Sequence, residues 1–318
     1  MSTTGSSIPA TAPLRGTGGI EDRSVSPAGT KPHREWPLAL LMLSPSTAVF
    51  GVFIFYPLVR TIWLGFYDVN IFGDARWVGF SQYAEVLTSS QFRDSLWATV
   101  LFTFLTVPLG MVAGLALAVL AHQRLRGIGV FRTMFSSTVA TSVAVASLMW
   151  LTLLNPSVGI INQALRGIGQ DPINFLQHPT WALPSVALAT VWLHLGFTFI
   201  IMSAGLQSVP DELLESAVVD GASPWMRFRE VTLPLLSPTM LFALVVLTIN
   251  AFQSFGQIDL LTQGGPLGRT NVLVYSIFRQ VPTNPGVASV QAFALFGIVL
   301  TLTLVQFKVL ERRVFYGD

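Results

Sequence analysis

The stretch VTLPLLSPTMLFALVVLTINAFQSFGQI, residues 231–258, contains no Asp, Glu, Lys or Arg. A helix needs about 20 apolar residues to cross about 30 Å of hydrocarbon, and this stretch is long enough to do so. Backbone N–H and C=O groups inside a bilayer must be paired within their own segment. The stretch therefore predicts a transmembrane helix.

The same absence of charge recurs along the chain. The six charge-free stretches cover residues 36–59, 95–123, 133–165, 172–210, 231–258 and 280–307. A membrane β-barrel would show alternating strands of about ten residues, and these stretches do not alternate. The expected fold class is an all-α membrane protein with six transmembrane helices, referred to below as spans one to six.

The composition of the whole chain agrees with this fold class. Of its 318 residues, 52% are hydrophobic and only 11% are charged, against about 25% charged in soluble chains. The chain has no cysteine, which excludes thiolate catalysis and cysteine-ligated metals and leaves the redox compartment unreadable. Its four histidines show no metal-binding spacing. We therefore expect no metal site, no cofactor and no catalytic residue in this chain.

Residues 1–35 differ in composition from the rest. Ser, Thr, Pro and Gly dominate, with scattered basic residues and almost no large apolar side chain. Such a segment buries too little surface to offset its ordering entropy, so we expect a disordered cytoplasmic tail. The first apolar run starts too late and is too long for a cleaved signal peptide. Residues 36–318 then form the membrane domain.

The distribution of Lys and Arg between the loops predicts the orientation of the spans. With the N-terminus inside, twelve basic residues lie in cytoplasmic segments and six in outer segments. The cytoplasmic set is Arg15, Arg23, Lys31, Arg34, Arg124, Arg126, Arg132, Arg227, Arg229, Lys308, Arg312 and Arg313. The outer set is Arg60, Arg76, Arg93, Arg166, Arg269 and Arg279. Both termini are therefore expected in the cytoplasm.

The loop between spans four and five, about residues 209–235, predicts two short helices. With the start of span five it reads VPDELLESAVVDGASPWMRFREVTLPLLSP, residues 209–238. Pro210 precedes acidic residues, which favour the positive end of a helix. Asp220-Gly221 ends that helix, and Ser223 caps a second helix that starts at Pro224. Two prolines are expected to stop the second helix before span five: Pro234 and Pro238.

These two helices are expected to lie across the cytoplasmic face. The first has an apolar stripe beside its acidic residues. Helices that lie on a lipid surface are usually rich in Lys and Arg, so an acidic face disfavours contact with lipid headgroups. Docking to a partner protein is the interpretation that the pattern favours.

The same loop resembles the cytoplasmic signature of permease subunits of binding-protein-dependent ABC importers. That pattern runs E-A-A, two residues, D-G-A, five residues, F, two residues, an aliphatic residue, one residue, L-P, three residues, P. Ser216 stands where the pattern has Ala. The matching positions are Glu215, Ser216, Ala217, Asp220, Gly221, Ala222, Phe228, Val231, Leu233, Pro234 and Pro238.

The resemblance runs from about Trp36 to the C-terminus. The segment 258–266 resembles the loop after the fifth helix of sugar-type permeases, and Gly79-Phe80 with Tyr83 resembles their first outer loop. The chain is most similar in kind to importers of glycerol-3-phosphate or of a glycerophosphodiester such as glycerophosphocholine. The segments behind that narrower resemblance are 304–316 and 154–159.

This resemblance implies the partners. The chain would be one of two different permease subunits in a hetero-dimer in the bacterial plasma (inner) membrane, bound to an ATPase dimer and an extracytoplasmic solute-binding protein. The helices from Glu215 to Phe228 would be coupling helices seated in a cleft of one ATPase. ATP and magnesium would bind to that partner, and this chain would not be an enzyme. No nucleic acid is expected as a partner.

Polar side chains inside the spans are candidates for a substrate path. Span five places amides and a hydroxyl at i, i+3, i+4 and i+7, namely Asn250, Gln253, Ser254 and Gln257. That spacing puts them on one helical face, which suits a polyol or phosphodiester, although an interhelical hydrogen-bond seam is the alternative. In span four, His194 with Trp192 is a candidate contact, and a core histidine with satisfied hydrogen bonds is the simpler interpretation.

A phosphate ester would also need cationic or N–H donors near the outer mouth. Arg60, Arg269 and Arg279 are the candidates, and solvation at the surface explains each equally well. A di- or oligosaccharide importer is the alternative within the same family. An ion-coupled carrier would place charged residues at mid-membrane depth, and an intramembrane enzyme would need paired catalytic side chains there. The six stretches contain neither.

Overall fold

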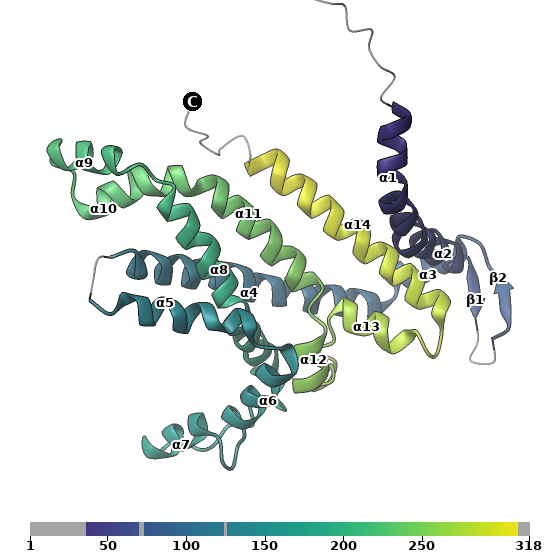
Figure 1. The fold of residues 1–318 in the computed structure, drawn as a ribbon. Helices are drawn as coiled ribbons and strands as arrows, with labels where there is room; N and C mark the ends of the chain where they lie inside the picture. Colours follow the sequence, from purple (N-terminus) through teal and green to yellow (C-terminus); the bar gives the residue numbers. More distant parts are fainter. Residues whose placement is uncertain (1–35, 70–72, 124–125, 311–318) are drawn as a thin grey trace, which may run out of the picture. The chain divides into compact units, whose positions relative to one another are not determined.

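The computed structural model describes residues 36–69, 73–123 and 126–310, which are almost entirely helical (Figure 1). The predicted tail, residues 1–35, lies outside the described residues, as do Arg124, Arg312 and Arg313. The described chain forms two compact units, one ending at Phe53 and the other beginning at Ile54.

The first unit contains α1 (Trp36–Phe50), and the π-helical turn η1 (Gly51–Phe55) crosses the boundary between the units. The second unit holds the remaining elements in chain order. These are α2 (Tyr56–Leu64), β1 (Tyr67–Val69), β2 (Ala75–Trp77), α3 (Ser81–Thr88), α4 (Ser90–His122), α5 (Ile128–Ser136), η2 (Ser137–Ala140), α6 (Val143–Leu153), α7 (Ile160–Gly167), α8 (Ala182–Gln207), α9 (Asp211–Val219), α10 (Pro224–Arg227), η3 (Phe228–Thr232), α11 (Leu233–Phe252), α12 (Gly256–Leu261), α13 (Leu273–Gln280) and α14 (Pro285–Leu310).

Within the described residues, 5 helices are long and apolar enough to cross a membrane. They are Ala39–Leu64, Ser90–His122, Ala182–Gln207, Pro224–Phe252 and Pro285–Val309. A sixth span arises if Ile128–Ala140 and Val143–Leu153, which are bent by 108°, cross together. The predicted all-α membrane fold is therefore confirmed, with the third span bent rather than straight.

The third and fifth spans are interrupted where they meet. The third breaks before Val143, where the Ser142 hydroxyl accepts a hydrogen bond from the Val145 N–H and caps a new helix. The fifth breaks after Phe252 and resumes at Gly256. A Cβ on Gly256 would lie 2.7 Å from Val143 Cγ1, so the two restarted helices touch. A side chain at position 256 would have to displace Val143, so glycine allows this close contact between the two breaks.

The second short helix of the loop between spans four and five does not stop before span five, contrary to the prediction from Pro234 and Pro238. Helix α10 continues through η3 into α11, and Pro238 lies inside α11. A proline clashes with the carbonyl four residues earlier, which for Pro234 is Glu230. Glu230 is the middle residue of η3, whose wider π turn accommodates that carbonyl. Likewise, η1 lies just before Pro57 and contains the residue four positions before it.

Helices α4, α8 and α11 pack together in the second unit (Figure 1). Phe199 and Met202 of α8 and Leu236 of α11 are almost fully buried in their shared core. A Cβ added to Gly114 of α4 would lie 2.7 Å from Thr198 Cβ of α8. Small residues let membrane helices approach closely, and α4 and α8 do so at Gly114.

An aromatic cluster surrounds the antiparallel β1–β2 hairpin. Phe66 stacks on Trp77 at 5.4 Å between ring centroids and meets Phe80 edge to face at 5.1 Å. The Tyr83 hydroxyl donates a hydrogen bond of 2.9 Å to the Ile62 carbonyl, and burial raises the pKa of the Tyr83 phenol. Tyr83 also meets Phe293 of α14, so the cluster joins α2, α3 and α14.

One buried asparagine fixes the loop between α6 and α8. Asn162 is fully buried, and its Nδ2 donates to the carbonyl oxygens of Ile173 at 3.0 Å, Asn155 at 3.2 Å and Leu154 at 3.4 Å. Its Oδ1 accepts from the Ile173 N–H at 2.7 Å. A single side chain therefore pairs backbone groups on both sides of α7.

Replacing Asn162 by alanine is expected to lower the free energy of unfolding by about 2 kcal/mol, because buried backbone groups lose their partners. Denaturant unfolding of the detergent-solubilised chain measures the change. Gln163→Ala is the control, since that exposed side chain makes one bond, to the Val158 carbonyl. Equal stability of the two variants would contradict the role given to Asn162.

Candidate functional site

Helix α9 ends in a turn that requires a residue with positive φ. The Ala222 N–H donates to the Ala217 carbonyl at 2.9 Å, and the Gly221 N–H donates to the Val218 carbonyl at 3.0 Å. This bond pair is the Schellman arrangement, which needs a left-handed residue after the helix cap. Gly221 supplies it with φ +79°. The glycine of the D-G-A pattern is thus explained by backbone conformation.

Helix α10 begins as the sequence predicts. The Ser223 hydroxyl accepts a hydrogen bond of 3.3 Å from the Met226 N–H, and Pro224 occupies the first turn. Trp225 packs on Phe228 with ring centroids 5.7 Å apart. Both short helices of the loop are therefore present, and α9 and α10 are joined by the turn at Gly221.

The two short helices expose an apolar and acidic surface. Val219 is 86% exposed, Trp225 is 68% exposed and Leu213 is 45% exposed. A hollow beside α9 brings Ser216, Ala217 and Asp220 together with the start of the fifth span. The remaining residues of the signature lie outside that hollow: Glu215, Gly221 and Ala222 are on α9 or its turn, and Phe228 is against Trp225. Large exposed apolar side chains of this kind mark a binding surface.

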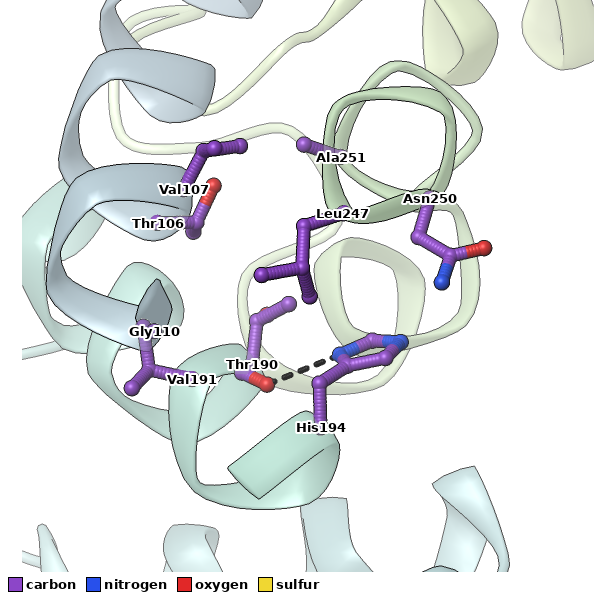
Figure 2. A pocket seen from close by; sticks show the side chains of 9 residues that line it. All are labelled: Thr106, Val107, Gly110, Thr190, Val191, His194, Leu247, Asn250 and Ala251. Atoms are coloured by element: carbon purple, nitrogen blue, oxygen red, sulfur yellow. Dashed lines mark hydrogen bonds between the residues drawn. The ribbon is translucent and has the colours of Figure 1, made fainter. Parts of the chain in front are cut away.

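A small cavity lies between α4, α8 and α11, and Figure 2 shows the side chains that line it. The lining residues are Thr106, Val107 and Gly110 of α4, Thr190, Val191 and His194 of α8, and Leu247, Asn250 and Ala251 of α11. Its volume is about 10 Å³, which is the room of one water molecule. The described conformation is therefore closed to a sugar-sized solute at this point.

His194 presents a defined polar atom to the cavity (Figure 2). Its Nδ1 lies 2.9 Å from the Thr190 carbonyl oxygen. A carbonyl oxygen only accepts hydrogen bonds, so Nδ1 carries a proton. In the neutral ring Nε2 is then an acceptor. The interpretation of His194 as a core histidine with satisfied hydrogen bonds therefore holds for Nδ1 only. Asn250, which is also a candidate for contact with the solute, lines the same cavity.

The predicted polar face of span five is wrong in its geometry. Helix α11 ends at Phe252, so Asn250, Gln253, Ser254 and Gln257 do not share one helix. Gln253 is exposed at the break, whereas Ser254 and Gln257 are buried and the Ser254 hydroxyl donates to Gln257 Oε1 at 3.2 Å.

Trp192 takes a packing position. It is half-buried, meets Trp150 edge to face at 6.4 Å, and does not line the cavity. Thr190, whose carbonyl oxygen accepts from the His194 ring, is not among the residues predicted from the sequence. Its position four residues before His194 on one helix is a signal that could have identified it.

Comparison with known proteins places these features in context. Residues 37–316 match the family model of the binding-protein-dependent transport system inner membrane component. The chain is 36% identical over 286 residues to the sn-glycerol-3-phosphate transport system permease protein UgpA of Agrobacterium fabrum, covering 88% of this chain and 97% of that protein. It is 35% identical over 279 residues to the trehalose/maltose transport system permease protein MalF of Thermococcus litoralis, covering 87% and 95%.

The fold is also found in a solved structure. A chain in the crystal structure of a bacterial ABC transporter involved in the import of the acidic polysaccharide alginate matches with a TM-score of 0.77 at 25% identity. The match covers 88% of this chain and 96% of that chain.

Proposed function

The chain belongs to the family of binding-protein-dependent transport system inner membrane components, and from this premise we propose that it forms half of the translocation path for glycerol-3-phosphate or a glycerophosphodiester. ATP hydrolysis on a partner subunit drives the transport. The remaining subunits are a second, different permease, an ATPase dimer that binds ATP and magnesium, and an extracytoplasmic solute-binding protein.

The family fixes the general role of the chain. It is a multi-pass permease component of an ABC importer in the inner membrane, of the carbohydrate or glycerol-3-phosphate type, and is not itself an enzyme. The proposed orientation has both termini in the cytoplasm, which places α9 and α10 on the cytoplasmic face. The observation that carries the proposed coupling to an ATPase is the Schellman turn at Gly221, which joins two exposed short helices.

The signature residues Glu215, Ser216, Ala217, Asp220, Gly221, Ala222 and Phe228 form the proposed contact with the ATPase. Exposed apolar side chains on α9 and α10 give that contact buried area, and the acidic residues of α9 favour a basic rim on the partner. The chain itself contributes no catalytic group in this proposal.

The proposed solute contacts are His194 and Asn250, because both line the cavity between α4, α8 and α11. With room for about one water, the cavity must widen when solute passes, so the three helices have to separate during transport. Gln253, Ser254, Gln257 and Trp192 are weaker candidates, since they lie outside that lining in the described conformation.

Two relatives of nearly equal sequence identity suggest different classes of solute. One is named for glycerol-3-phosphate and the other for trehalose and maltose. A mostly apolar cavity that offers a histidine and an amide suits a solute with hydroxyl groups in either case. Arg269 at the mouth of a groove on the second unit supports the phosphate ester. A disaccharide remains the second candidate because of the trehalose/maltose relative.

ATP hydrolysis by the reconstituted complex tests this function. With the binding protein present, glycerol-3-phosphate or glycerophosphocholine should stimulate hydrolysis severalfold, and maltose or trehalose should not. Stimulation by a disaccharide alone would reject glycerol-3-phosphate and glycerophosphodiesters as the solute, but it would agree with the role of the chain as an ABC importer permease. Transport by this chain alone down an ion gradient, without ATP, would reject the coupling to an ATPase.

Variants of the cavity test its role in the same assay. His194→Ala and Asn250→Ala should raise the solute concentration needed for half-maximal stimulation, because each removes a polar contact. Gln253→Ala is the control, since that side chain is exposed at the break after α11. Variants of the cavity that behave like this control would show that solute passes elsewhere.

A further inference from the structure

A groove much larger than the cavity of Figure 2 lies where α4 and α8 begin. It has a volume of about 910 Å³ and is lined by the first turns of α4, by residues around the start of α8 and by the loop after α12. No residue of this groove lines the cavity described above. The groove is thus a separate site on the second unit.

The loop after α12, which lines one edge of the groove, is held in place by hydrogen bonds to α4. Asn271 Nδ2 donates to Ser95 Oγ at 3.1 Å, and the Leu273 N–H donates to Thr99 Oγ1 at 2.8 Å. Within the loop, Thr270 Oγ1 donates to the Gly265 carbonyl at 2.7 Å. These bonds fix the segment that carries Arg269 along the edge of the groove.

The groove lies at the opposite end of α8 from the coupling helices. Its lining includes Leu183 and Pro184 in the first turn of α8, whereas α9 follows the last turn. The 26 residues of α8 extend about 39 Å, which is the thickness of a bilayer with part of its headgroup regions. The groove therefore opens at the membrane face opposite α9 and α10, which is the outer face in the proposed orientation.

The lining changes from polar to apolar along α4. Asp94 lies at the outer end, and Ala98, Leu101 and Leu105 follow at spacings of three and four residues, which place them on one face. From Asp94 to Leu105 the helix rises about 16 Å. A ligand that follows this gradient has a polar end at the membrane surface and an apolar part that extends toward the bilayer centre.

Two charges of opposite sign stand at the polar end. Asp94 and Arg269 both line the groove and are exposed. Both residues lie in the described part of the chain, and the structure gives no ion pair between Asp94 and Arg269. Together they match a headgroup that carries both a phosphate and an ammonium group.

We propose that this groove binds a zwitterionic phospholipid of the outer leaflet, with its phosphate at Arg269, its ammonium at Asp94 and an acyl chain along Leu101 and Leu105. The proposal shares the membrane orientation and Arg269 with the proposed function, whereas Asp94 and the apolar floor belong to this proposal alone, so variants at Asp94 and Leu101 separate the failure of one from the failure of the other. A free glycerophosphodiester would satisfy the two charges but would leave the apolar floor without a partner.

Native mass spectrometry of the full chain, extracted with the subunits that copurify with it, tests the proposal. Titration with phosphatidylethanolamine should give binding about tenfold tighter than with phosphatidylglycerol, because Asp94 repels an anionic headgroup and attracts an ammonium. Asp94→Asn should remove this preference, and Arg269→Gln should weaken binding of both lipids. The controls Asp171→Asn and Arg76→Gln, at exposed positions away from the groove, should bind as the wild type does.

A second pair of variants separates lipid from free headgroup. Leu101→Gln places an amide on the floor of the groove and should weaken phosphatidylethanolamine binding about tenfold. The neighbouring Val100→Gln is the control, because Val100 is exposed on α4 but does not line the groove. Tight binding of glycerophosphoethanolamine that Leu101→Gln leaves unchanged would identify a water-soluble ligand and overturn the proposal.

Two further outcomes would also overturn it. Equal binding of both lipids to the wild type and to every variant would mean that the retained lipid is only part of the surrounding bilayer. A groove that binds lipid in the isolated chain but none in the assembled transporter would mean that the second permease subunit covers it.

Discussion

Replacing Gly221 by valine is expected to abolish ATP-driven uptake while the chain still accumulates in the membrane. Gly221 has φ +79°, and a side chain in this left-handed region costs about 1–2 kcal/mol, with β-branched residues the worst tolerated. No atom lies within 4 Å of a Cβ at this position, so the cost arises from the backbone alone. The turn can relieve it only by changing the angle between α9 and α10.

That angle sets how the two exposed helices meet the ATPase in the proposed function. Uptake into vesicles should fall to background in the Gly221→Val variant, while ATP hydrolysis continues without response to solute. Asp220→Arg, which reverses a charge on the same turn, should uncouple in the same way. Gly221→Asn should retain part of the uptake, because asparagine tolerates the left-handed conformation better than other side chains.

The matched control for Gly221→Val is Gly127→Val. Gly127 has φ +83°, no atom lies within 4 Å of its Cβ position, and it precedes α5 in another turn. The backbone cost is therefore the same in both variants. Wild-type uptake by an assembled Gly221→Val or Asp220→Arg complex would contradict the coupling role.

The second large effect is expected at Gly114, where α4 and α8 approach each other. Gly114→Leu should lower the free energy of unfolding by more than about 3 kcal/mol, because a Cβ there already lies 2.7 Å from Thr198 Cβ and 3.3 Å from the Thr198 backbone carbon. The helices have to separate to admit the side chain. The measurement is denaturant unfolding in detergent, together with the amount of chain in the membrane.

Gly110, one turn earlier on the same helix, provides the control. A Cβ on Gly110 would lie 3.7 Å from Leu247 Cδ1, which is ordinary van der Waals contact. Gly110→Ala should therefore be neutral or slightly stabilising, since alanine has the higher helix propensity. Gly114→Ala should fall between the wild type and Gly114→Leu. Equal stability of Gly114→Ala and Gly110→Ala would show that α4 and α8 do not depend on a glycine at their contact.

The turn between α9 and α10 could be predicted from sequence residue by residue, because its signals are local. Pro210, Ser223 and Pro224 act within one helical turn of their own positions, and Gly221 is needed for a single backbone angle. The number of spans could be predicted for a similar reason, since the absence of charge over about 20 residues reflects the bilayer rather than neighbouring helices.

The breaks in the third and fifth spans could not be predicted in this way. They occur where Gly256 meets Val143, two residues that are far apart in sequence. A polar face on span five requires an unbroken helix. Because α11 ends at Phe252, Ser254 and Gln257 do not share a helical face with Asn250. The helix end predicted at Pro234 is not observed, because the π turn η3 accommodates the carbonyl that the proline ring would otherwise meet.

The continuity of α10, η3 and α11 has a mechanical consequence. A single rod of 29 residues, about 43 Å long, runs from Pro224 to Phe252, two residues beyond Asn250 in the cavity lining. If α10 contacts the ATPase as proposed, a force applied at Pro224 reaches the cavity along one lever arm, without a loop in which the displacement could be lost.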